Sequence, residues 1–271
     1  MAAPDARDLE LTEVARLLAE QGGRLALRLQ GRSAVTRKAD DSPVTDADHA
    51  VQELILAELA RRFPNDAVLV EERLSGRTVH ADRATAEYCW VIDPIDGTRN
   101  FARGSPMVST SVAVLRHGRP VAGAIFDGSS GQSACATRGG GATVAGRRVA
   151  LVDRPADVDT SVAVSSFRLH PIPPGVRRLL DRVLIRNVGS ACIHQVWLAA
   201  GYVDGLFAPD TKLWDIAAGA LLMEEAGAIV TDVQGRPRWP VNLCEPDATV
   251  RDLLAGRPAM HATLLAAARE P

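Results

Sequence analysis

One short segment combines an apolar run with two closely spaced acids. Residues 90–101 read Trp-Val-Ile-Asp-Pro-Ile-Asp-Gly-Thr-Arg-Asn-Phe, so Asp93 and Asp96 follow directly where a buried strand would leave the core. Gly97 allows the backbone to approach a ligand closely, and Thr98 is suited to begin a helix whose free N–H groups can hold an anion. Two hard oxygen ligands beside an anion site suit Mg²⁺. Taken alone, this spacing favours the inert alternative, a strand that ends in an acidic turn.

Three other segments also place an acid at the edge of an expected apolar element. Asp48 lies in the first turn of an expected helix, on the same face as core residues, and taken alone it is a helix cap. Glu71 follows a short apolar strand, and Asp215 lies in the first turn of an Ala-rich helix that Gly227 closes. The chain therefore offers four acidic segments far apart in sequence.

These acids could be independent caps and surface charges, or they could form one site. Two like charges 4 Å apart repel by about 4 kcal/mol at an effective dielectric of 20, so five clustered carboxylates would need divalent cations. Such cations also polarise a phosphate oxygen and acidify a bound water. Phosphate monoesters, which hydrolyse very slowly unaided, suit a site of this kind. Spacing alone leaves both alternatives open.

The hydrophobic pattern predicts an α/β architecture that would position these acids. The expected helices cover residues 8–30, 46–63, 176–183, 192–201 and 214–226, and the expected strands cover 67–70, 90–92, 109–115, 121–126, 161–165 and 228–230. The strands 109–115 and 121–126, with the glycine-rich turns at 128–131 and 139–141 that follow, should form an antiparallel meander. Gly22 and Gly23 should weaken the first helix. Segment 73–87 should be a polar loop, and the tail beyond 230 should be mostly irregular until a short final helix.

Composition excludes some classes of function. The 271 residues carry a net charge of −2, with 46 % apolar and 24 % charged residues, which is ordinary for a globular protein and gives no support for nucleic-acid or anionic-membrane binding. The four cysteines are scattered without zinc-like spacing, which favours a reducing compartment. No apolar run approaches the ~20 residues of a membrane span, and no signal core follows the charged start. We expect a cytoplasmic protein.

The acidic segments together resemble the inositol monophosphatase family. Its two signature motifs match residues 93–98 and 214–219, the second followed by Glu225-Ala226-Gly227, while residues 43–48 and 71–72 match its other two acidic segments in the expected order. The similarity runs from about residue 10 to 265. It implies a layered αβαβα fold in one compact unit, with residues 1–150 carrying most metal ligands and 151–271 completing the site. It also implies Mg²⁺-dependent hydrolysis of a small phosphomonoester, usually in a homodimer.

The resemblance assigns a role to each matching residue. Glu71, Asp93 and the Ile95 carbonyl would hold one metal ion; Asp93, Asp96 and Asp215 would hold a second; and Glu71 would help to hold a weaker third. Glu71 would thus take part in catalysis, as would Thr98 paired with Asp48, which would position or activate the attacking water. The implied substrate contacts are Asp96, the backbone amides of Gly97 and Thr98 toward phosphate, Gly189, Ser190, Ala191 and Asp215. Family members displace the alcohol without a phosphoenzyme, and lithium often inhibits them.

The identity of the substrate stays open at this stage. Inositol phosphatases place a sugar-gripping glutamate where this chain has Ala208, although Asp210 is nearby. The leading candidate substrate is inositol monophosphate or a similar polyol phosphate, and the alternative substrates are histidinol phosphate, fructose bisphosphate and 3′-phosphoadenosine 5′-phosphate. The alternative to an enzyme is a binding role like that of bacterial relatives that act with the transcription machinery. Arg99 and Arg103 could meet a second phosphate or a carboxylate, or be solvated loop charges. His194 could touch substrate.

Overall fold

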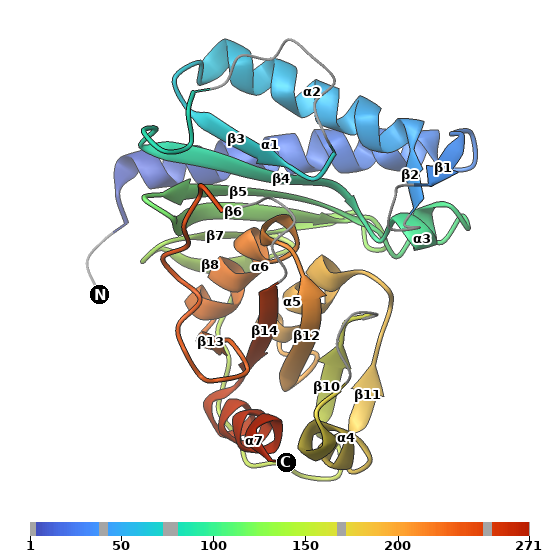
Figure 1. The fold of residues 1–271 in the computed structure, drawn as a ribbon, viewed down its shortest axis with the longest axis vertical. Helices are drawn as coiled ribbons and strands as arrows, with labels where there is room; N and C mark the ends of the chain where they lie inside the picture. Colours follow the sequence, from blue (N-terminus) through green and yellow to red (C-terminus); the bar gives the residue numbers. More distant parts are fainter. Residues whose placement is uncertain (1–3, 38–42, 73–80, 167–171, 246–250, 271) are drawn as a thin grey trace.

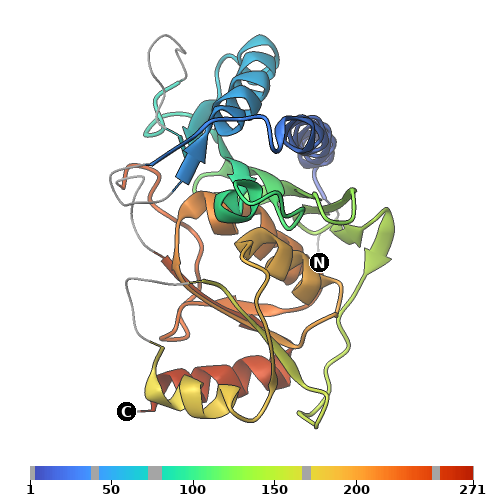
Figure 2. The same cartoon turned by 90° about the vertical axis from the view of Figure 1, so that its right-hand side faces the viewer.

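The computed structural model stacks five layers in the order helix, sheet, helix, sheet, helix (Figures 1 and 2). It describes residues 4–37, 43–72, 81–166, 172–245 and 251–270. This αβαβα arrangement confirms the expected fold class. In the described residues, no helix is long and apolar enough to cross a lipid bilayer. The expected division of the chain near residue 150 stays a prediction.

Helices α1 (Ala6–Leu29) and α2 (Asp46–Arg62) cover one face of a seven-stranded sheet. Its strands, in spatial order, are β3 (Ala67–Val70), β4 (Tyr88–Asp96), β5 (Ser109–Arg116), β6 (Arg119–Asp127), β7 (Gln132–Thr137), β8 (Gly141–Val144) and β9 (Arg147–Val149). From β4 onward the sheet is the expected antiparallel meander, whereas β3 pairs with β4 in parallel. The carboxyl ends of β3 and β4 therefore lie at the same edge.

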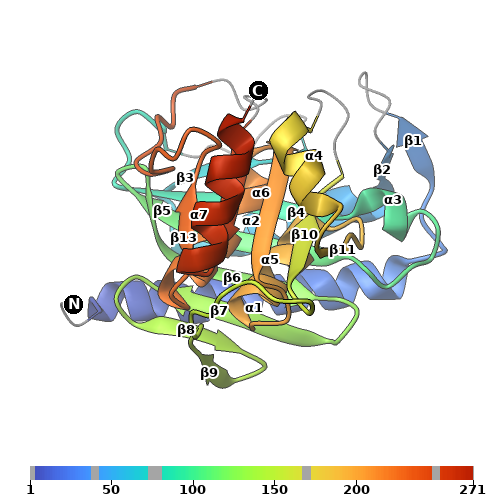
Figure 3. The same ribbon diagram turned by 90° about the horizontal axis from the view of Figure 1, so that it is seen from below.

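Helices α5 (Ala191–Ala199) and α6 (Leu213–Glu225) fill the space between this sheet and a second one (Figure 1). The second sheet contains, in spatial order, β11 (Leu184–Arg186), β10 (Ser161–Val164), β12 (Gly205–Thr211), β14 (Arg251–Gly256) and β13 (Ile229–Thr231). Helices α4 (Pro174–Leu180) and α7 (Pro258–Arg269) cover its outer face (Figure 3). Both faces of each sheet are thus covered along most of their length, as expected for strands that read as continuous apolar runs.

Two small elements join the acidic segments to these layers. The hairpin β1 (Val35–Arg37) and β2 (Pro43–Thr45) leads directly into α2, and the single turn α3 (Thr98–Phe101) follows β4. α3 packs beside β2 (Figure 1). The end of β4 therefore lies close to the start of α2.

The expected helices and strands are present with small shifts at their ends, but the second sheet contains strands that the sequence pattern missed. The expectation of a mostly irregular tail is wrong at Arg251–Gly256, because β14 forms there and pairs with both β12 and β13. The final helix, α7, has 12 residues and is not short. Of the expected loop 73–87, residues 73–80 lie outside the described residues, and 81–87 contain turns.

Gly22 and Gly23, which are expected to weaken α1, do not interrupt it, since the helix continues unbroken through both. Both glycines are buried, and their lack of a side chain lets α1 approach the sheet closely. A Cβ atom on Gly23 would lie 2.1 Å from Cδ1 of Phe126 in β6. The low intrinsic helix propensity of glycine is thus offset by close packing.

We predict that Gly23→Ala destabilises the protein although alanine is the better helix former. Phe126 is enclosed and must move to admit the methyl group, and such overpacking costs about 1–3 kcal/mol. Denaturant unfolding should show this loss, while the exposed substitution Gln21→Ala on the same helix changes stability by less than about 0.5 kcal/mol. A stabilised Gly23→Ala variant would contradict the packing argument.

Candidate active site

The parallel pair β3 and β4 brings two of the predicted acids to one edge of the first sheet. Glu71 follows β3 directly, and its backbone N–H donates to the Ile92 carbonyl of β4 at 3.3 Å. Asp93, the next residue of β4, is 1 % exposed. The Glu71 carboxyl interacts with that of Asp93, both electrostatically and through a hydrogen bond. Local strand pairing is therefore sufficient to join these two acids.

Asp96 and Asp215 complete an acidic cluster with Asp93. One carboxylate oxygen of each of the three residues lies within 4.8 Å of those of the other two. Asp96 ends β4, whereas Asp215 comes from the first turn of α6. The structure thus brings together residues from both halves of the sequence, as the metal-site hypothesis requires.

Burial and mutual repulsion make this cluster unfavourable when it is fully charged. Burial, followed by the charges of Glu71, Asp96 and Asp215, raises the pKa of Asp93 well above its ordinary value. Burial, followed by Asp96 and Glu71, likewise raises the pKa of Asp215. Among the described residues, the buried Oδ1 atom of Asp93 has no hydrogen-bond partner. A hard divalent cation such as Mg²⁺ would satisfy that oxygen and offset the repulsion, so the donor set fits the expected metal.

The amino terminus of α5 holds Asp96 in place. The Asp96 carboxylate accepts hydrogen bonds from the Ser109 hydroxyl at 3.0 Å, from the Ala191 and Cys192 N–H groups at 3.2 and 2.8 Å, and from the Ser190 hydroxyl. These N–H groups have no partner within the helix and favour a negative charge. Ser190 and Ala191, which the sequence predicts as substrate contacts, therefore also position an acid. Ser109 was missed, because its register opposite Asp96 is visible only in the sheet.

The second helix of the middle layer holds Asp215. Its carboxylate accepts from the Lys212 N–H at 2.6 Å, and its backbone carbonyl accepts from the Gln195 side chain of α5 at 2.7 Å. A Cβ atom on Gly219 would lie 2.1 Å from Oε1 of Gln195, so α5 and α6 pack closely only with glycine there. Sequence analysis did not identify Gln195, because a glutamine within an apolar helix carries no local signal of its partner.

Asp48 and Thr98 lie on the α2 side of the same edge. Asp48 is 0 % exposed and accepts from the N–H and hydroxyl of Thr45 at 2.8 and 2.6 Å, which forms the expected helix cap. The Thr98 hydroxyl donates to the Ile95 carbonyl at 3.0 Å. These two bonds differ from the pairing of Thr98 with Asp48 that the resemblance implies, and that pairing stays a prediction.

A pocket of about 310 Å³ opens next to the acids. It is lined by Pro43, Glu71, Gly97, Thr98, Arg99, Asn100, Arg103, Ser166 and Gly189. Gly97 is needed at its wall, because its φ is 87° and a Cβ atom would lie 2.9 Å from the Met107 carbonyl. The predicted residues Glu71, Gly97, Thr98 and Gly189 therefore share one small cavity.

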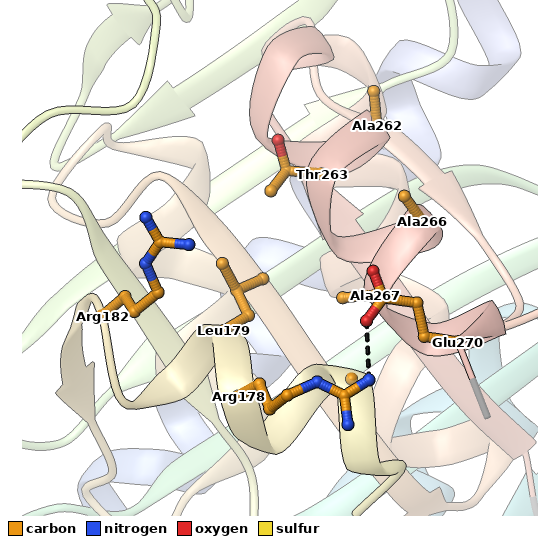
Figure 4. Close-up of a pocket in the computed structure, with 9 residues that line it drawn as sticks. Arg178, Leu179, Arg182, Ala262, Thr263, Ala266, Ala267 and Glu270 are labelled. Carbon is orange, nitrogen blue, oxygen red and sulfur yellow. Dashed lines mark hydrogen bonds and ion pairs between the residues drawn. The ribbon is translucent and has the colours of Figure 1, made fainter.

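A larger hollow of about 570 Å³ lies between α4 and α7 on the outer face of the second sheet (Figure 4). Three alanines of α7 line one side of it, and its carboxylate among the described residues, that of Glu270, is paired with Arg178 at 2.7 Å. None of the residues that the sequence predicts for chemistry lines it. Volume alone therefore does not identify the active site.

Two residues singled out in the sequence are buried away from this pocket. His194 is 0 % exposed; its Nε2 accepts from the Val188 N–H at 2.9 Å and its Nδ1 faces the Ser165 hydroxyl at 3.3 Å. The suggestion that His194 touches substrate is therefore wrong. Ala208 is enclosed within β12, and Asp210, in a left-handed conformation with φ 61°, belongs to the irregular end of that strand.

Comparison with known proteins agrees with this fold and this site. The model of the inositol monophosphatase family matches residues 8–271, and the chain belongs to that family. It is 32 % identical over 243 residues to inositol-1-monophosphatase of Mesorhizobium japonicum, covering 88 % of this chain and 86 % of that protein. It is 35 % identical over 207 residues to Nus factor SuhB of Pasteurella multocida, covering 74 % and 75 %.

Solved structures show the same architecture. The extragenic suppressor protein SuhB of Bartonella henselae superposes with a TM-score of 0.82 at 28 % identity, covering 96 % of this chain and 99 % of that one. The similarity therefore extends over both sheets and all three helical layers.

Replacing Asp93 by Asn should stabilise the protein when metal is withheld. The raised pKa means that ionisation of Asp93 costs free energy in the folded state that it does not cost in the unfolded chain, where water solvates the carboxylate, and the isosteric amide removes this cost. We expect the Tm in EDTA to rise by about 2–4 °C per kcal/mol relieved. Mg²⁺ should then raise the Tm of the parent more than that of the variant. The exposed Glu53→Gln on α2 is the matched control, and a lower Tm of Asp93→Asn in EDTA would count against a repulsive cluster.

Acid should destabilise the protein through His194. Because Nε2 accepts a hydrogen bond, the ring is neutral with its proton on Nδ1, and burial lowers its pKa from 6.5 to about 4. The unfolded chain binds the extra proton first, so this contribution is present above pH 6.5 and is lost between pH 6.5 and 4, up to about 3 kcal/mol. Unfolding free energies at several pH values should fall less steeply in His194→Gln than in the parent or in the exposed His117→Asn. NMR detection of a charged ring at pH 6 would refute the assignment.

Proposed function

We propose that this protein is a Mg²⁺-dependent phosphatase that hydrolyses a small phosphomonoester by direct attack of water. The observation that carries the proposal is the convergence of Asp93, Asp96 and Asp215 beside the pocket that Glu71 and Gly97 line. Membership of the inositol monophosphatase family supports the same reaction class. Two or three Mg²⁺ ions per site would polarise the phosphate and acidify a water.

The protein residues would divide the remaining work. Glu71, Asp93 and the Ile95 carbonyl would hold one ion, and Asp96 and Asp215 would join Asp93 around a second, with Glu71 also serving a third. The backbone at Gly97 and Thr98 would receive the phosphate. The Thr98 hydroxyl and Asp48 would orient the attacking water, and Gly189, Ser190 and Ala191 would border the leaving alcohol. A homodimer in the cytoplasm and sensitivity to lithium belong to the same proposal and rest on the resemblance to the family.

Two observations bear on which phosphomonoester is the substrate. The name of the Mesorhizobium relative supports inositol monophosphate or a similar polyol phosphate. Ala208, enclosed in β12, offers no carboxylate to grip hydroxyl groups. Histidinol phosphate, fructose bisphosphate and 3′-phosphoadenosine 5′-phosphate therefore remain alternative substrates.

Relatives that carry the name Nus factor SuhB favour a second candidate, a binding or regulatory role that keeps the fold. The acidic cluster argues against binding as the sole role, because a site without catalysis would have no need to keep three acids in mutual repulsion. Calorimetry distinguishes the two: uptake of Mg²⁺ supports the phosphatase, and its absence supports the binding role.

Asp93→Asn should abolish Mg²⁺-dependent phosphatase activity while the protein stays folded. Removing one charged ligand of a metal site costs several kcal/mol of transition-state stabilisation, or about 10³-fold in kcat. The test is turnover of a panel of small phosphomonoesters by the parent, by Asp93→Asn and by the control Glu53→Gln. Undiminished activity in Asp93→Asn, or no turnover of any compound by the parent, would refute the proposal.

A further inference from the structure

Two arginines form the part of the pocket wall that the proposed reaction leaves unused. Arg99 in α3 and Arg103 in the turn that follows both line the cavity together with Glu71, Gly97 and Thr98. Both residues therefore border the same cavity from one short turn. Among the described residues, neither guanidinium has a hydrogen-bond or ion-pair partner. By contrast, Arg138 is paired with Glu224 at 2.7 Å.

The turn that carries these arginines is fixed rather than loosely tethered. The side-chain amide of Asn100 donates to the carbonyls of Met107 and Val188, each at 2.7 Å. The Ser105 N–H donates in turn to the Asn100 carbonyl at 3.0 Å. These bonds join the arginine turn to the segment that precedes α5. The backbone that carries the two arginines is therefore held beside the phosphate end of the pocket, and no carboxylate of the described part of the chain neutralises them.

The charges of the rest of the pocket show what these cations would meet. Among the residues that the structure describes, Glu71 is the only acid in the lining, and in the proposed reaction bound metal would balance its charge. Pro43, Asn100, Ser166 and Gly189 are uncharged. The pocket wall therefore suits a substrate with a second anionic group. A substrate with several hydroxyl groups fits it less well, because Ala208 supplies no side chain that could accept hydrogen bonds from them.

We propose that the substrate is a phosphomonoester whose leaving group carries a second acidic group, a phosphate or a carboxylate, and that Arg99 and Arg103 bind this group. The inference rests on the proposed phosphatase function. A guanidinium fork can hold either anion through two parallel hydrogen bonds. The cavity of about 310 Å³ is at the small end of the range for metabolite sites, which suits a compact doubly anionic ester.

Matched substrate pairs test the proposal. 3-Phosphoglycerate carries a carboxylate where glycerol 1-phosphate carries a hydroxymethyl group, and fructose 1,6-bisphosphate carries one phosphate more than fructose 1-phosphate. We expect the parent to prefer the acidic member of at least one pair by about tenfold or more in kcat/KM. The double variant Arg99→Gln/Arg103→Gln should bring that ratio close to one. Arg99→Lys/Arg103→Lys should keep part of it, and Arg147→Gln, an exposed arginine on β9, should keep all of it.

The outcomes separate this inference from the proposed function. A parent that hydrolyses both members of each pair without preferring the acidic one overturns the inference alone, as does a ratio that the double variant leaves unchanged. If the parent hydrolyses neither these four compounds nor any other phosphomonoester of the panel described above, the phosphatase proposal fails. Calorimetric titration with 3-phosphoglycerate and glycerol 1-phosphate then decides: tighter binding of the acid that the double variant loses supports the anion site, and equal binding overturns it.

Discussion

Repulsion among buried carboxylates is the constraint on which the rest of this site depends. Asp93 is enclosed in β4 with Glu71, Asp96 and Asp215 close by, and burial strengthens each repulsion because water no longer screens it. The fold compensates in part. Asp96 lies at the amino terminus of α5 and Asp215 in the first turn of α6, where unpaired N–H groups favour negative charge. Asp93, in a strand, receives no such help, so it is the acid that most needs a cation.

The layered architecture makes this clustering possible. Parallel pairing of β3 with β4 places Glu71 beside Asp93, but α5 and α6 can bring Asp215 near only if both fit between the two sheets. Small residues permit that fit: a Cβ atom on Gly123 of β6 would lie 3.0 Å from the Ala218 backbone of α6, and Gly219 accommodates Gln195. The small residues of α6 thus let this helix pack close to the first sheet, which brings Asp215 near the other acids.

Much of the acidic site was predictable from the sequence, because the acids that form it stand where the sequence pattern is clearest. The apolar runs before Glu71 and Asp93 end abruptly in acids. The sequence therefore shows where these strands end, although it does not show which strands or helices lie beside them. Partners on a neighbouring strand or helix were missed because no local pattern marks them. Ser109 and Gln195 are ordinary polar residues until the sheet register and the helix packing place them against Asp96 and Asp215. Likewise β14 reads as irregular, since its pairing with both β12 and β13 leaves no trace in a short apolar run.

The turn from Gly97 to Arg103 is part of both the acidic cluster's surroundings and the pocket wall that Arg99 and Arg103 form. Its first residues face the acids, and Asn100 ties it to Val188, two residues before the Ser190 hydroxyl that binds Asp96. A shift of this turn would therefore move the phosphate end of the pocket, the arginines and the support of Asp96 together. The same hydrogen bonds support the acidic cluster and the proposed anion site. Substitution of the exposed arginine side chains can therefore change substrate preference without disturbing the acids, whereas a shift of the backbone would disturb both.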